Sequence, residues 1–128
     1  MKTNLDKFYK TEKSLEEDGV WFDIDSETGF LVRRIDQSKI NKIVSLKYKK
    51  YARQFAMGTL NELIEKKILA EIFVDKFLVD WRGIEIDDSV VDFERDIAVK
   101  LFVERKDLFD ALVSFASNIE SFQEEVGN

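Results

Sequence analysis

The sequence contains no cysteine, no histidine and no proline, and only five glycines in 128 residues. Without cysteine the chain has no disulfide, no thiolate metal ligand and no cysteine nucleophile. Without histidine it lacks the side chain most often used as a general base and metal ligand near neutral pH. No phosphate-binding loop accompanies these absences. A binding role is therefore favoured over catalysis, and we expect no enzyme activity, no cofactor and no metal site.

Long uncharged apolar runs are also missing. The most apolar window, residues 68–81, contains four charged side chains and is too short to span a membrane. Residues 1–19 lack the apolar stretch of a signal peptide. We therefore expect a cytoplasmic protein without membrane contact.

The residues that are present indicate one folded domain. Hydrophobic residues make up 45% and charged residues 36% of the chain, a mixture typical of folded helical proteins. A single domain over residues 1–128 is expected, with residues 1–18 as a candidate flexible N-terminal tail. The net charge of −6 disfavours nucleic acid as a partner, because a phosphate backbone repels an acidic chain.

The chain is organised around residues 59–83, which read as one long helix. Thr59 and Glu62 have the spacing of a capping box, and Gly83 can close the other end. Apolar side chains point in nearly every direction around this helix. We therefore expect it to be either the central core helix or shared with a partner.

Residues 19–35 predict a β-hairpin, with turn residues at 25–29 between two runs of aromatic and β-branched residues. Trp21, Phe30 and Val32 are the candidates for its buried face. A hairpin is marginal alone, so it should pack on helices or pair with another chain.

Residues 38–57 predict a second helix, antiparallel to the central one. Its apolar stripe consists of Ile40, Val44, Tyr48, Tyr51 and Phe55. Its opposite face is basic and carries Lys39, Lys42, Lys49, Lys50 and Arg53, with Lys47 at the flank. Three interpretations of that face stay open: a solvated surface, a contact with an acidic protein, or nucleic-acid binding.

The C-terminal third predicts a small ribbon or turn around Asp87-Asp88-Ser89, then a short helix over residues 94–104. Asp107 is the expected cap of the last helix. The apolar stripe of that helix has heptad spacing and either belongs to the core or contributes to a subunit or partner interface. It consists of Leu108, Leu112, Phe115, Ile119, Phe122 and Val126. The expected fold is α+β and mainly α-helical, with an N-terminal β-hairpin packed on a bundle of about four helices.

Two further features have a structural and a functional interpretation. Seven carboxylates around the ribbon form either a solvated acidic face or an acid–base or cation site, but nothing fixes their spacing, so the solvated face is favoured. They are Asp80, Glu85, Asp87, Asp88, Asp92, Glu94 and Asp96. Trp81 is interpreted as a large core anchor, with an exposed functional role as the alternative.

The C-terminal part of the chain contains Val79-Asp80-Trp81-Arg82-Gly83-Ile84, then Asp92-Phe93-Glu94 and Lys106-Asp107-Leu108-Phe109. In this pattern, from Phe77 onward, the chain resembles the tail assembly chaperones of long-tailed bacteriophages and prophages. The upstream hairpin and the Lys-rich helix also fit the N-terminal half of that family. The chain departs from the family at Asp87-Asp88-Ser89, where members usually carry Gly. The residues that carry the resemblance are Val79-Asp80-Trp81-Arg82-Gly83-Ile84, Asp92-Phe93-Glu94, Ala98, Leu101, Lys106-Asp107-Leu108-Phe109, Ala116, Phe122, Gly19-Val20-Trp21-Phe22 and Val32-Arg33-Arg34.

The resemblance implies a non-catalytic protein that binds the aggregation-prone tape measure protein and keeps it soluble while tail tube subunits assemble around it. It implies a location in the bacterial host cell and absence from the mature virion, and the family often produces a longer frameshifted form. Protein partners are therefore expected: the tape measure protein, the tail tube protein and further copies of this chain. The rival hypothesis is a small helical regulatory or nucleic-acid-binding protein that uses the basic helix 38–57. The predicted partner-binding residues are Lys39, Lys42, Lys49, Lys50, Arg53, Trp81, Leu108, Leu112, Phe115, Ile119 and Phe122.

Overall fold

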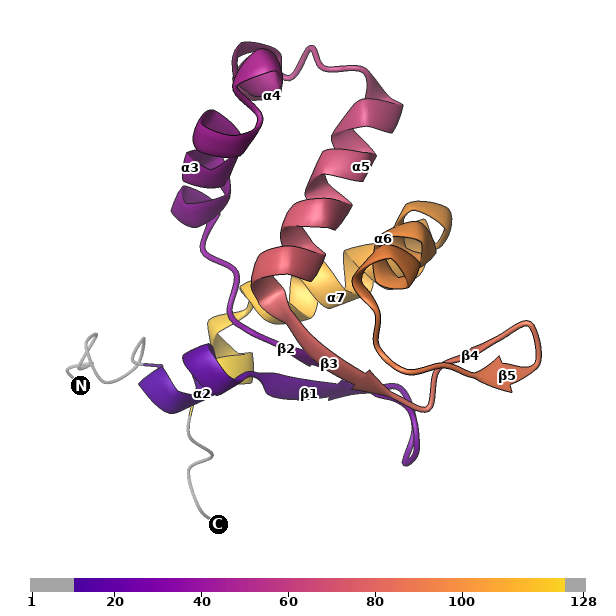
Figure 1. The fold of residues 1–128 in the computed structure, drawn as a ribbon. Helices are drawn as coiled ribbons and strands as arrows, with labels where there is room; N and C mark the ends of the chain where they lie inside the picture. Colours follow the sequence, from indigo (N-terminus) through magenta and orange to yellow (C-terminus); the bar gives the residue numbers. More distant parts are fainter. Residues whose placement is uncertain (1–10, 124–128) are drawn as a thin grey trace, which may run out of the picture.

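A three-stranded antiparallel sheet and the helices around it form the computed structural model, which describes residues 11–123 (Figure 1). The strand order is β1-β2-β3, with a separate two-stranded ribbon β4-β5. The predicted mainly helical α+β fold is confirmed. The strands are β1 (Val20–Asp23), β2 (Gly29–Val32), β3 (Leu78–Arg82), β4 (Glu85–Ile86) and β5 (Ser89–Val90). The α-helices are α2 (Lys13–Asp18), α3 (Gln37–Lys47), α4 (Ala52–Met57), α5 (Glu62–Ile72), α6 (Arg95–Glu104) and α7 (Lys106–Ser117).

The predicted hairpin is confirmed as β1 and β2. Its turn is held by the Asp25 carboxylate, which accepts from the amides of Glu27 and Thr28 at 2.8 Å each. Phe30 and Val32 are fully buried, as predicted. The prediction for Trp21 was wrong, because Trp21 pairs with Leu31 on the opposite face of the sheet and is only half-buried.

The predicted helix over residues 59–83 was too long at its C-terminal end. Helix α5 ends at Ile72 and passes through a π-helical turn, η2 (Phe73–Phe77), directly into β3. Strand β3 pairs with β2, with Phe30 opposite Trp81, so the hairpin belongs to a larger sheet. Leu78 and Trp81 are buried while Asp80 is exposed. Burial against β2 therefore outweighs the helical pattern of the local sequence.

Gly83 does not close a helix, because it follows strand β3. Its φ is +68°, and a Cβ on this residue would overlap the carbonyl oxygen of Glu27. Glycine is needed here because the backbone approaches the β1–β2 turn closely.

The predicted capping box at Thr59 was also wrong. The cap is Asn61, whose side chain accepts from the amides of Leu63 at 3.0 Å and Ile64 at 3.4 Å. The Thr59 amide instead donates to Gln54 at 2.9 Å, which closes the preceding helix α4. Gly58 sits at that end with a left-handed φ of 68°.

The predicted helix over residues 38–57 is interrupted at Tyr48. Its φ of −121° and ψ of 42° separate α3 from the 3-10 turn η1 (Lys49–Tyr51) and from α4. Asp36 caps α3 by accepting from the Ser38 amide at 3.0 Å. The apolar stripe still faces the core: Val44 is buried, and its other members are half-buried against the core. We call α3, η1 and α4 together the arm.

The small ribbon predicted around residues 87–89 is confirmed as β4 and β5. Asp87 and Asp88 form its turn with φ values of 51° and 64°, the region that glycine favours. In Figure 1 the ribbon projects from the side of the molecule opposite α2. The short helix predicted over residues 94–104 is confirmed as α6.

The last predicted helix divides into α7 and the 3-10 turn η3 (Ile119–Phe122). Helix α7 follows Arg105 without a side-chain cap, so the prediction that Asp107 caps it was wrong. Asn118 caps η3 by accepting from the Glu120 amide. Of the stripe, Leu112 and Phe122 are fully buried, and Val126 lies outside the described residues.

One contiguous apolar cluster joins the sheet to the helices. Its aromatic rings meet edge to face: Phe73 on Phe102 at 5.5 Å and Trp81 on Phe93 at 5.4 Å between ring centres. The Trp81 indole also donates to the Val91 carbonyl at 2.9 Å. Helix α5 lies between the arm and α6 (Figure 1), which explains why it is apolar on several sides. Within residues 11–123, no helix combines the length and the apolarity that crossing a membrane requires.

Candidate functional site

A cleft of about 770 Å³ opens between α2, the segment that joins β2 to α3, the first half of α3 and the end of η2. Six cationic and three acidic side chains line it, so its formal charge is 6 − 3 = +3, in a chain of net charge −6. We call this the basic cleft. Its lining residues are Lys13, Glu16, Glu17, Arg33, Arg34, Asp36, Lys39, Lys42, Ile43, Lys76 and Phe77.

Hydrogen bonds hold the segments around the cleft in place. The Arg33 amide donates to the Phe77 carbonyl at 2.7 Å and fixes η2 to the segment after β2. The Arg33 guanidinium donates through Nε to the Glu17 carbonyl at 2.7 Å, and Arg34 pairs with Glu16 at 2.7 Å. These contacts attach α2 as one wall of the cleft. Asp36 starts α3, from which Lys39 and Lys42 project.

The three carboxylates of the cleft already have partners. Glu16 accepts from the Thr11 hydroxyl and from Arg34, and these contacts hold the pKa of Glu16 below its usual value. Hydrogen bonds from the Ser38 hydroxyl and amide lower the pKa of Asp36. Glu17 lies 3.8 Å from Lys13 across an exposed pair. Contacts with neighbouring groups therefore fix all three carboxylates in the wall.

Three of the six cations that line the cleft are exposed lysines with no ion-pair partner in the part of the chain that the structure describes. Lys39, Lys42 and Lys76 are exposed, and no carboxylate of residues 11–123 lies within ion-pair distance of them. Two apolar side chains line the same cleft, and we call them its apolar floor: Ile43, which is half-buried, and Phe77, which is 4% exposed. The cleft thus combines unpaired ammonium groups with an apolar floor.

Only two of the five predicted basic residues line the cleft, Lys39 and Lys42. The break at Tyr48 places Lys49 and Lys50 on η1 and Arg53 on α4, outside the cleft, although all three are exposed. The sequence did not indicate Lys13, Arg33, Arg34 and Lys76 as site residues. They come from three separate segments, and only the folded chain brings them to α3.

The predicted apolar partner-binding residues divide by burial. Trp81 is 4% exposed and Leu112 and Phe122 are fully buried, so packing accounts for all three. Leu108, Phe115 and Ile119 are half-buried. Phe115 contacts the ring of Phe22 at 5.0 Å between centres. A contact of this stripe with a partner stays a prediction.

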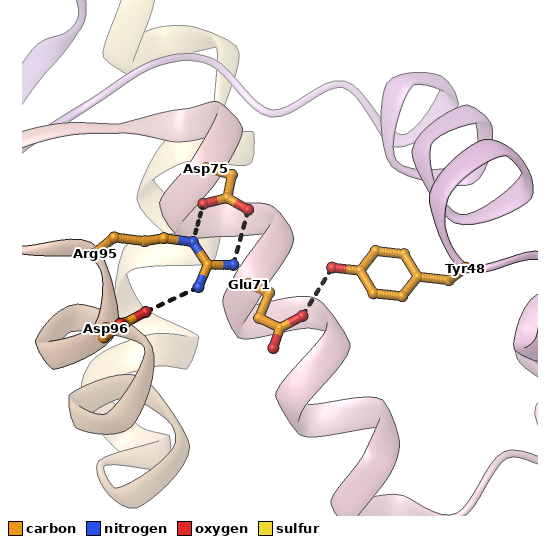
Figure 2. A network of polar contacts seen from close by, with 5 residues as sticks. All are labelled: Tyr48, Glu71, Asp75, Arg95 and Asp96. Atoms are coloured by element: carbon orange, nitrogen blue, oxygen red, sulfur yellow. Dashed lines mark hydrogen bonds and ion pairs between the residues drawn. The ribbon is translucent and has the colours of Figure 1, made fainter.

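Polar contacts attach the arm to α5 and attach α6 to η2 (Figure 2). The Tyr48 hydroxyl donates to Glu71 at 2.9 Å. Burial is the larger cause and this hydrogen bond the smaller cause that raise the pKa of Tyr48 to about 12. Arg95 binds both carboxylate oxygens of Asp75 at 2.7 and 3.1 Å and reaches Asp96 at 3.0 Å. These two carboxylates raise the pKa of Arg95. The Tyr48 hydrogen bond attaches the arm that carries Lys39 and Lys42 to α5, and the Arg95 contacts attach α6 to η2.

Residues 11–123 contain no group of three or more acidic side chains arranged to hold a metal ion. The comparison with protein families gives one finding: residues 35–127 match the sequence model of a family described as YdaY prophage protein. The match covers well over half of the chain. No curated protein and no solved structure shows a significant match.

Proposed function

The chain belongs to the YdaY prophage protein family, and from this premise we propose that it is a non-catalytic tail assembly chaperone. Its client is the tape measure protein, which it binds and keeps soluble in the cytoplasm of the host cell while the tail tube protein assembles. It is absent from the mature virion. The resemblance of residues 77–122 to such chaperones supports this proposal.

The separation of charge on the molecule carries the proposal. The basic cleft has a formal charge of +3, so the rest of the chain carries −6 − 3 = −9. A chaperone must bind its client through one surface and keep the complex soluble through the others. An acidic exterior provides that solubility by mutual repulsion between complexes.

Exposed apolar side chains support a second element of the proposal, self-association. Met57 at the end of α4 is 63% exposed and Leu63 at the start of α5 is 68% exposed. They lie on either side of the turn between these helices. In Figure 1 this turn is at the end of the molecule farthest from the sheet. We propose that this end contributes to a homo-oligomer.

Co-expression with the tape measure protein encoded by the same prophage tests the chaperone function. We expect the client to move from the insoluble to the soluble fraction and to co-purify with this chain. We also expect the gene to lie between those for the tail tube and tape measure proteins. A client that stays insoluble, or one that is soluble alone, contradicts the proposal.

One observation favours the rival, nucleic-acid binding: Lys39, Lys42, Lys49, Lys50 and Arg53 are all exposed. Such binding should weaken steeply with salt, and the double variant Lys42→Glu, Lys49→Glu should abolish it. If DNA and RNA fail to bind even at low salt, this function is excluded.

A further inference from the structure

We infer that the basic cleft binds an acidic, amphipathic helical segment of the client, with its carboxylates on Lys39, Lys42 and Lys76. This inference rests on the proposed function and specifies the chemistry of the partner. The predicted binding surface was the basic face of the helix over residues 38–57, whereas the inferred site is a cleft formed by four segments.

Charge complementarity is the first argument. The ammonium groups of these three lysines are exposed and have no carboxylate of residues 11–123 within ion-pair distance. Lys39 and Lys42 are three residues apart on α3, and Lys76 belongs to η2. The three cations therefore border the cleft from two different elements. Carboxylates spaced along the face of a partner helix in the cleft would pair with cations from both elements.

The apolar floor is the second argument. Ile43 and Phe77 line the same cleft as the cations. Burying apolar side chains of the partner against this floor would contribute affinity that surface ion pairs alone do not supply. A volume of about 770 Å³ holds several side chains of one helix face. The partner therefore needs an apolar stripe beside its carboxylates, as in other helix-in-groove complexes.

The fixed carboxylates of the wall favour a protein over a nucleic acid. Glu16, Glu17 and Asp36 line the cleft, and contacts with neighbouring groups keep the pKa values of Glu16 and Asp36 low. A uniformly charged phosphate backbone would be repelled by these groups and by the acidic remainder of the chain. A peptide can place its carboxylates beside the lysines and neutral residues beside Glu16 and Glu17.

The wall is also held ready for binding. Arg33 and Arg34 use hydrogen bonds to attach α2, and the Arg33 amide attaches η2. The elements around the cleft are therefore positioned before a partner arrives, which lowers the entropy cost of association.

Fluorescence anisotropy with a synthetic peptide tests the inference on the full chain. The probe is a fluorescein-labelled amphipathic peptide of Glu, Leu and Ala, about five helical turns long. We expect the double variant Lys39→Glu, Lys42→Glu to weaken binding at least about tenfold. The matched control is Lys67→Glu, Lys100→Glu, which makes the same change of net charge at exposed lysines outside the cleft. It should change the dissociation constant less than about threefold.

Three results would overturn the inference. Equal losses in the two double variants would show that only net charge matters. Equal binding of a peptide in which Lys replaces Glu would show that acidity is not recognised. Tighter binding of a single-stranded oligonucleotide of equal charge would assign the cleft to nucleic acid. Circular dichroism and urea unfolding of each variant exclude a loss caused by misfolding.

The co-expression assay separates this inference from the proposed function. If Lys39→Glu, Lys42→Glu still solubilises the tape measure protein, the chaperone function stands and the cleft is not its binding site. If the wild-type chain binds the acidic peptide but does not solubilise the client, the cleft stands and the chaperone function fails.

Discussion

The hydroxyl of Tyr48 donates a 2.9 Å hydrogen bond to Glu71, so the residue at which the arm bends is also the residue that attaches it to α5 (Figure 2). Neither proline nor glycine occurs at this bend. The bend separates Lys39 and Lys42, beside the cleft, from Lys49 and Lys50. The Tyr48–Glu71 contact therefore helps to decide which cations form the site.

The substitution Tyr48→Phe should lower the free energy of unfolding by about 0.5–1.5 kcal/mol, because it removes the hydrogen bond and leaves the Glu71 carboxylate without it. Urea unfolding followed by circular dichroism measures the change. Tyr51→Phe is the matched control, since the Tyr51 hydroxyl makes no hydrogen bond within residues 11–123. Equal effects of the two substitutions would contradict a role for the contact.

The same contact predicts a dependence of stability on alkaline pH. The pKa of Tyr48 is about 12 in the folded protein, above the usual value of about 10 in an unfolded chain. Because the folded value is the higher one, the contribution is complete below about pH 10 and is lost as the pH rises toward 12. The wild-type protein should therefore lose stability relative to Tyr48→Phe over this interval. Urea unfolding of both proteins across the interval tests this, and a constant difference would refute it.

Trp81→Ala should lower the free energy of unfolding by about 3–5 kcal/mol, because the buried indole packs on Phe30 and Phe93 and binds the Val91 carbonyl. The control is Trp21→Ala, which removes a half-buried indole that lies 4.3 Å from the Arg82 guanidinium. That loss should be about 1–2 kcal/mol. Denaturant unfolding measures both losses. A larger loss at Trp21 would contradict the assignment of the core to the face of the sheet that carries Trp81.

Gly58 and Gly83 have the same φ of 68°, but only Gly83 lies close to another part of the backbone. Comparing alanine substitutions at the two positions therefore separates the cost of steric overlap from the cost of the left-handed conformation. Gly58→Ala should cost about 1–2 kcal/mol from the left-handed conformation alone, because nothing lies within 4 Å of the added Cβ. Gly83→Ala should cost at least about 1 kcal/mol more, because its Cβ would overlap the Glu27 carbonyl. Thermal and denaturant unfolding give both values. A smaller loss at Gly83 would show that the turn at residues 25–28 moves aside.

Self-association predicts a mass above 15.0 kDa in light scattering coupled to gel filtration. Leu63→Glu should reduce that mass, because it places a charge at the exposed apolar end of α5. Ile24→Glu is the control, since Ile24 is 53% exposed in the β1–β2 turn, away from that end. A strict monomer at high concentration would contradict the proposal.

The sequence predicted those elements whose signals are local. The hairpin, the ribbon, α6 and the burial of Val44 and Phe30 follow from turn residues, alternation and a helical stripe. The end of the central helix was missed because Leu78–Arg82 becomes a strand through pairing with β2, about fifty residues earlier in the chain. The local sequence of residues 78–82 does not predict that pairing.

The candidate site shows the same division. Lys39 and Lys42 were predictable, because they stand on one face of a local helix and no acidic residue lies between Lys39 and Arg53. Lys76 was assigned to the central helix, and the π-helical turn that directs it toward the cleft has no signal in the sequence. Arg33 and Arg34 follow a strand whose distance from α2 is set by tertiary contacts.

The Glu12 amide donates to the Phe122 carbonyl at 2.9 Å, and the Ile35 amide donates to Ala116 at 2.9 Å. The segments before and after the hairpin thus complete their backbone pairing only with residues made roughly a hundred positions later. During synthesis, the hairpin of β1 and β2 is made well before Phe115, which contacts Phe22, and Phe122, which binds Glu12. Closure of the domain therefore waits until Ala116 and Phe122 have been made.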